Sequence, residues 1–175
     1  ADNALRSGNI KQTASILGDV AKRNNNLILQ WTAALAYIQI RDLVTANHFL
    51  GRSQEVTHGD VVTMLLRHAT QSLAGTEATA NATWLEITRK YGSETGVLDL
   101  AAPLHRIRDF LDSKGSCSIL MLLQADLHQF AGEPNVSQEI YRRIIKQQQN
   151  WPRPHVNLGL ALLSSGQTTE AVTVL

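Results

Sequence analysis

The chain has 175 residues, with 16 basic and 15 acidic side chains and a formal net charge of +1. So small a charge argues against nucleic acid or an anionic membrane surface as an electrostatic partner. Apolar residues make up 43% of the sequence, enough for a packed core, and the single cysteine, Cys117, excludes an internal disulfide. No apolar run reaches the roughly 18 residues of a membrane helix, so no membrane insertion is expected in this segment.

An apolar stripe at positions i, i+4 and i+7 recurs along the chain and predicts the second helix of a helical hairpin. The stripes begin 33, 34, 57 and 34 positions apart, at Thr13, Ala46, Ala80, Ser137 and Ala171. A small residue stands eleven or twelve positions before each of them, where we expect the two helices of a hairpin to cross. These small residues are Ala1, Ala34, Ala69, Ala125 and Gly159.

Residues 1–91 are predicted to hold hairpins of this kind, of which the first is partial. The hairpin at 62–91 departs from the pattern, because the spacing from Ala69 to Ala80 is one residue short. Residues 92–115 interrupt the period, and we interpret them as one extra helix with the apolar face Leu100, Leu104, Ile107 and Leu111. The alternative is a degenerate hairpin whose partner helix is hidden in the pattern. Pro103 suits the first turn of that helix, and we expect a joint here, with a local change of superhelix direction.

Residues 116–175 are predicted to return to hairpins, with the last one partial. Pro152 opens a helix that carries a stripe of Leu158, Leu162 and Leu163. Gly166 ends this helix, and a second helix begins with Ala171 and Leu175 facing back toward the first.

A helix–turn–helix unit of 34 residues with small residues at the crossing resembles the tetratricopeptide repeat. The residues that carry the resemblance are Gly159, Gly166 and Ala171 in the last unit, Ala125, His128, Gly132, Tyr141 and Ile144 in the unit before it, and Ala34, Tyr37, Ala46 and Leu50 near the start. The resemblance implies an all-α, right-handed α-solenoid interrupted by one extra helix. Because both terminal units are partial, we expect an internal piece of a longer solenoid.

By the same resemblance, a partner would bind the concave wall formed by the first helices. The residues predicted to line this wall are Trp31, Gln39, Arg67, Asp126, Gln129, Phe130, Arg153 and Asn157. Aromatic and arginine side chains carry most interface energy, which favours Trp31, Phe130, Arg67 and Arg153 as anchors. Trp31 and Phe130 fit core packing equally well. The aliphatic residues of the same faces, Leu35, Leu66, Leu122 and Leu160, are interpreted as packing between first helices.

The sequence holds no catalytic or metal-binding motif. His48, His58 and His68 are ten positions apart, which is not ligand spacing on a helix. Cys117 starts a predicted helix, whose dipole can lower the pKa of a thiol, but no base is assignable to it and it is interpreted as an ordinary small residue. The basic cluster Arg142, Arg143 and Lys146 is interpreted as a solvated helix face. We therefore expect neither an enzyme nor a cofactor.

The predicted function is a non-catalytic scaffold that binds another protein or a peptide. Periplasmic proteins of the family that the chain resembles assist the assembly or export of a polysaccharide or pilus, and a role of that kind fits the low charge. The alternative is an accessory or regulatory domain of a larger enzyme, such as a glycosyltransferase or peptidase, with catalysis outside this segment. Self-association through the incomplete ends is a third option, and the cytoplasm and the bacterial periplasm both remain open as compartments.

Overall fold

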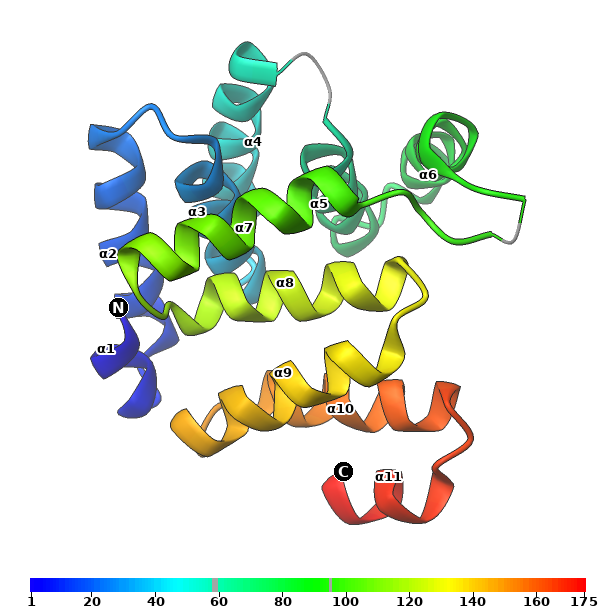
Figure 1. Cartoon of the computed structure of the whole chain (residues 1–175). Coiled ribbons are helices and arrows are strands. Elements are labelled where there is room, and N and C mark those ends of the chain that lie inside the picture. The colour runs from blue at the N-terminus through cyan, green and yellow to red at the C-terminus, as the bar shows by residue number, and fades with distance from the viewer. Residues whose placement is uncertain (58–59, 95) are drawn as a thin grey trace. The chain divides into compact units, whose positions relative to one another are not determined.

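A computed structural model describes residues 1–57, 60–94 and 96–175 (Figure 1). These residues form 11 α-helices and no strand other than an isolated bridge between Gly92 and Leu98, so the predicted all-α class is confirmed. The chain divides into two compact units. Unit 1 holds residues 10–99 together with Ala1, and unit 2 holds residues 2–9 and 100–175.

Unit 1 is a series of helices in which each packs on the next. They are α2 (Ile10–Arg23), α3 (Leu27–Gln39), α4 (Leu43–Thr57), α5 (Val61–Leu73) and α6 (Glu77–Tyr91). Helix α3 also contacts α5, so alternate helices touch as well as consecutive ones. The largest fully buried side chains in this unit are Trp31 and Phe49, which lie on α3 and α4.

Unit 2 has the same sequential packing. It contains α1 (Asp2–Arg6), α7 (Ala101–Lys114), α8 (Ser118–Phe130), α9 (Pro134–Gln147), α10 (Pro152–Ser164) and α11 (Thr168–Val174). From α7 to α11 each helix packs on its successor, and α10 also contacts α8. Pro134 and Pro152 each stand in the first turn of a helix, where a missing N–H is tolerated.

Five turns between helices in the described residues share one backbone motif. The second residue after the helix has a positive φ, at Gly8, Arg41, Gly75, Gly132 and Gly166. In the turn after α8, the N–H of Gly132 donates to the Gln129 carbonyl (3.1 Å) and that of Glu133 to the His128 carbonyl (2.9 Å). This is the Schellman arrangement, and the positive φ explains why glycine holds four of the five positions. The five residues are 33, 34, 57 and 34 positions apart, the same intervals as those between the predicted stripes.

The residues predicted to begin the second-helix stripes are all in the core. Thr13, Ala46, Ser137 and Ala171 are fully buried and Ala80 is 3% exposed. Of the predicted crossing residues, Ala34, Ala125 and Gly159 are buried, and a Cβ at Gly159 would come within 2.5 Å of the Leu175 side chain. The Leu175 side chain, which follows α11, thus occupies the space that a larger residue at position 159 would need.

Ala69 was the wrong choice of crossing residue for the hairpin of α5 and α6. The crossing residue lies seven positions before the positive-φ residue in the other hairpins, and that position here is His68. Its Nδ1 atom lies 3.0 Å from the Ala80 carbonyl oxygen, and its ring lies 5.4 Å from that of Trp84. The turn is therefore of normal length, and an imidazole fills the place that a small residue holds elsewhere.

The expected extra helix is present as α7, with Pro103 in its first turn. Leu100 and Ile107 of the predicted apolar face are buried, and Leu104 and Leu111 are half-buried. Before α7, the Ser93 N–H donates to the Val97 carbonyl (2.8 Å). The division between the two units falls after Asp99. The expected change of superhelix direction stays a prediction.

Candidate functional site

The strongest concentration of predicted wall residues lies in unit 2, where α8 and α10 are neighbours. Asp126 of α8 accepts two hydrogen bonds on its Oδ1 atom. One comes from the Tyr141 hydroxyl of α9 (2.6 Å) and the other from Nδ2 of Asn157 of α10 (2.8 Å). A single carboxylate oxygen therefore connects three consecutive helices.

Gln129, one turn further along α8, makes a second connection of the same kind. Its Nε2 donates to the Ser164 hydroxyl of α10 (3.0 Å), and its Oε1 accepts from the Ser137 hydroxyl of α9 (2.8 Å). Two levels of side-chain hydrogen bonds thus hold α8, α9 and α10 together. We call Asp126, Gln129, Asn157 and Ser164 the polar seam.

Burial dominates the electrostatics of the polar seam. Burial raises the pKa of Asp126 to about 6, although the hydrogen bond from Tyr141 and the positive charge of Arg153 act to lower it. Burial also raises the pKa of the Tyr141 hydroxyl, and the neighbouring Asp126 charge raises it further. Tyr141 therefore acts as a hydrogen-bond donor that fixes the carboxylate.

Exposed apolar side chains flank the polar seam. Val156, Leu160 and Leu163 of α10 are 43%, 58% and 44% exposed, and Phe130 at the end of α8 is 42% exposed. The three α10 residues stand at i, i+4 and i+7 and so share one face of that helix. Leu160 lies between Asn157 and Ser164 along the helix, which places this apolar row beside the seam. We call Phe130, Val156, Leu160 and Leu163 the apolar row.

Three predicted wall residues lie in unit 1 instead. Trp31 is fully buried, and its Nε1–H donates to the Thr63 hydroxyl (2.9 Å). Of its two interpretations, core packing is therefore confirmed, and its place among the wall residues is wrong. When a helix is apolar on all sides, its sequence does not reveal which side meets solvent. Gln39 and Arg67 are half-buried, on α3 and α5 respectively.

The aliphatic wall residues divide in the same way. Leu35, Leu66 and Leu122 are at most 8% exposed, which confirms their interpretation as packing residues. Leu160 is exposed, so its interpretation as a packing residue is wrong. Leu163 is also exposed, although the predicted stripe of Leu158, Leu162 and Leu163 places it in the core. The sequence reasoning also missed Tyr141 as part of the site. A buried tyrosine hydroxyl usually has a hydrogen-bond partner. The presence of Asp126 on the preceding helix was therefore the signal that could have identified Tyr141 as part of the site.

The remaining candidates for chemistry do not assemble into a reactive site. Burial raises the pKa of the Cys117 thiol, which agrees with its interpretation as an ordinary small residue. His128 is at a turn edge, with its Nδ1 on the Glu133 carboxylate (2.5 Å). His58 lies outside the described residues. Within the described part of the chain, no group of three or more His, Cys, Asp or Glu side chains could hold a metal ion.

Across the described segments, every helix is too short or too polar to cross a lipid bilayer. Comparison of the chain with protein-family models, with curated proteins and with solved structures gives no significant match.

Proposed function

We propose that the chain is a right-handed α-solenoid of tetratricopeptide-like hairpins and that it serves as a non-catalytic scaffold for another protein. Three features support this proposal: the repeated Schellman turn, the buried stripe residue five positions after each turn, and the contacts between alternate helices. Stacked hairpins of this kind expose the faces of their first helices, which repeat proteins use as binding walls.

The observation that carries the proposal is the apolar row beside the polar seam. Each side chain of the apolar row is about 40% or more exposed. Apolar side chains that gather on a surface in this way are typical of a site that a partner covers. The adjacent seam holds the backbones of α8 and α10 in register, so binding does not require ordering them. Phe130 has the size and low side-chain entropy of a typical hot-spot residue.

A partner segment for this face has two requirements. It must present apolar side chains to Phe130 and Leu160, and it must leave the seam hydrogen bonds intact, since their groups are already paired. Arg153 is exposed one turn before Asn157 and gives the face one positive end. We therefore propose a protein segment with an apolar stripe and an acidic end as the partner.

Site-specific photo-crosslinking tests this function. A benzophenone amino acid replaces Leu160 in one sample and Val172, 77% exposed on α11, in a control sample. We expect a discrete crosslinked protein from position 160 that position 172 does not give. The double variant Phe130→Ser and Leu160→Ser should weaken capture of that protein about tenfold or more, with unchanged circular dichroism. Equal crosslinking from both positions, or undiminished capture by the double variant, would contradict the proposal.

A further inference from the structure

Helix α7 is attached to unit 2 differently from the hairpin helices. It lies in the one interval between positive-φ turn residues that is 57 rather than 33 or 34 positions long, so it stands outside the hairpin repeat. Of its 14 residues, all of which the structure describes, Ile107 alone is buried. In α8 and α9, by contrast, eight and four residues are buried. The extra helix therefore rests on the unit through a narrow apolar contact.

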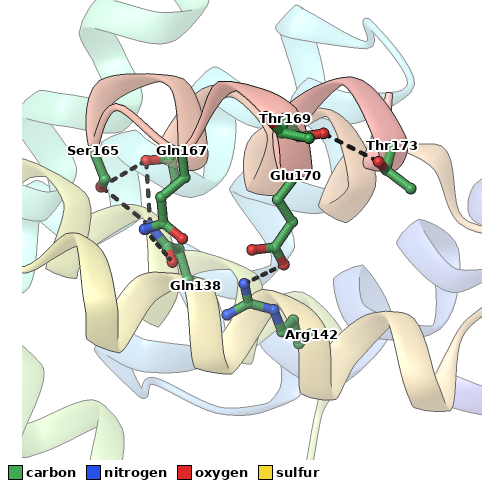
Figure 2. A network of polar contacts seen from close by, with 8 residues as sticks. Gln138, Arg142, Ser165, Gln167, Thr169, Glu170 and Thr173 are labelled. Atoms are coloured by element: carbon green, nitrogen blue, oxygen red, sulfur yellow. Dashed lines mark hydrogen bonds and ion pairs between the residues drawn. The ribbon is translucent and has the colours of Figure 1, made fainter.

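Polar side chains do not join α7 to the other helices. Elsewhere in unit 2 they do, as where Arg142 of α9 pairs with Glu170 of α11 at 2.6 Å (Figure 2). Among the described residues, the side chains of 102–114 make hydrogen bonds and ion pairs only within α7, such as that of His105 with Asp109 at 2.8 Å. These side chains would therefore lose no polar partner on another described helix if α7 moved away.

Both connections of α7 contain a glycine with positive φ. Gly96 precedes the helix with φ of 81°, and Gly115 follows it directly with φ of 84°. A Cβ at Gly115 would meet no atom within 4 Å, so there is open space around this position. The N-cap residue of α7 is Leu100, which gives the helix no side-chain cap. Glycines beside a weakly held helix are suited to the backbone changes of a hinge.

The side of α8 that faces away from α9 and α10 is apolar. Gln129 contacts both of those helices, and Leu120 and Leu127 stand about 180–200° around the helix axis from it. Both leucines are 1% exposed, and we call them the leucine face. In unit 2, α7 packs on α8 on the side opposite to α9 (Figure 1). An apolar surface of α8 and the extra helix therefore meet on the same side.

We infer that α7 is a displaceable strap over the leucine face of α8, and that an amphipathic helix of another protein replaces it there. The apolar face of α7 shows the chemistry of that ligand, with Leu104, Ile107 and Leu111 at i, i+3 and i+7. Arg108 and Asp112 of α7 are exposed and would keep the released helix in water. The inference goes beyond the proposed function, because it concerns the opposite side of α8 from α10.

The covalent connection makes α7 a strong competitor for this surface. Only residues 115–117 separate α7 from α8. A short tether of this kind gives an intramolecular ligand an effective concentration in the millimolar range, on the order of 1 mM. A helix added from outside therefore binds weakly while the strap is closed, and binds better once the contact of Ile107 is weakened.

The test uses a fluorescent peptide with blocked ends and the sequence of residues 99–115. A control peptide carries the changes Leu104→Ser, Ile107→Ser and Leu111→Ser. Fluorescence anisotropy measures binding to the whole chain and to its variant Ile107→Ser. We expect the variant to bind the first peptide about tenfold or more tightly than the wild type does, because its own α7 competes less. The control peptide should bind neither protein.

Hydrogen exchange shows whether the strap moves by itself. In Ile107→Ser we expect the amides of α7 to exchange about tenfold or more faster, with α9 and α10 unchanged. Arg108→Ser, at an exposed position of α7, is the matched control and should change neither exchange nor peptide binding. Leu160→Ser should also leave peptide binding unchanged, which separates the leucine face from the surface of the proposed function.

Three results would overturn the inference. The first is equal binding of the peptide by the wild type and Ile107→Ser, or equal binding of the two peptides by the variant. The second is loss of protection in α9 and α10 together with α7, because α7 would then be a structural part of the core. The third is a wild-type dimer that Ile107→Ser dissociates in sedimentation, since the ligand would then be α7 of a second copy.

Discussion

At the scale of single residues, Arg41 stands out among the turn positions. It holds the place of glycine in the repeated Schellman motif with φ of 59°, and its exposed side chain makes no hydrogen bond or ion pair in the described residues. Left-handed backbone costs a non-glycine residue roughly 1 kcal/mol or more, because Cβ approaches the following carbonyl. The arginine therefore strains the turn between α3 and α4 without a visible compensation.

Replacing Arg41 by glycine should stabilise unit 1. Relief of the positive φ is partly offset by the greater freedom of glycine in the unfolded chain, so we expect a gain of about 0.5–1 kcal/mol. Urea unfolding followed by the fluorescence of Trp31 and Trp84 measures it. The inverse control is Gly75→Ala in the same unit, where a Cβ meets no atom within 4 Å at φ of +74°. This control should lose about 1 kcal/mol. A destabilised Arg41→Gly protein would mean that the arginine side chain has a stabilising role.

Asp126 predicts a pH dependence of stability. Because its pKa rises from 3.8 to about 6 on folding, the folded state holds a proton that the unfolded state has released between these values. Stability from this group is therefore greatest at low pH, falls as pH rises from about 4 to about 6, and stays constant above that. An asparagine at this position cannot ionise, and its Oδ1 can still accept both hydrogen bonds of the seam.

The variant Asp126→Asn should thus be more stable than the wild type at pH 7.5, by about 1–3 kcal/mol, and similar to it at pH 3.5. Native-state hydrogen exchange of α8 and α9, which belong to unit 2, gives both values. Asp112→Asn, an exposed carboxylate on α7, is the control and should change stability little at either pH. A difference that does not depend on pH would show that Asp126 is not the titrating group.

At the scale of helices, the recurrence of the hairpin was predictable because it depends on residues that lie close together in the sequence. A left-handed turn residue, a buried stripe five positions later and a small residue seven positions earlier are all local. His68 was not predicted as the crossing residue, because the pattern was aligned on small residues and the neighbouring Ala69 fitted that pattern. The positive-φ residue, Gly75, sets the alignment correctly since backbone geometry allows few alternatives there.

The start of α8 shows what helix patterns cannot reveal. Its N-cap residue, Cys117, makes no side-chain capping bond, and the Asp2 carboxylate of α1 accepts from the Ser118 N–H instead (3.1 Å). The Ser118 hydroxyl also donates to Asp2 (3.2 Å) and accepts from the buried Gln148 (3.1 Å). The cap comes from 116 positions away in sequence, so no local signal marks it.

Contacts between residues far apart in sequence also limited the prediction of the candidate site. Helical spacing identified Asp126, Gln129, Phe130, Arg153 and Asn157 as one surface, because the first helices of successive hairpins repeat in register. It could not separate the exposed Leu160 from the buried Leu122, nor show that Trp31 is enclosed, since exposure depends on which helix covers which face.

At the scale of the whole molecule, chain order and compact units do not coincide. Helix α1 precedes α2 in sequence, yet residues 2–9 group with unit 2 while residues 10–99 form unit 1. The buried residues of α1 are Ala4 and Leu5, and Leu5 is only 1% exposed. The stability of unit 2 should therefore depend on the first helix of the chain, although most of unit 1 separates them in sequence.

Replacing Leu5 by alanine tests this dependence. Loss of a buried leucine costs about 2–5 kcal/mol, and the cost should fall on the unit that contains α1. We expect hydrogen exchange to quicken in α8 and α9 and to change little in α3 and α4, because cooperative units open separately. Phe49→Ala, at a fully buried position on α4, is the matched control and should give the opposite pattern. If Leu5→Ala instead accelerated exchange equally in both sets of helices, the chain would unfold as one cooperative body, and stability could not be assigned unit by unit.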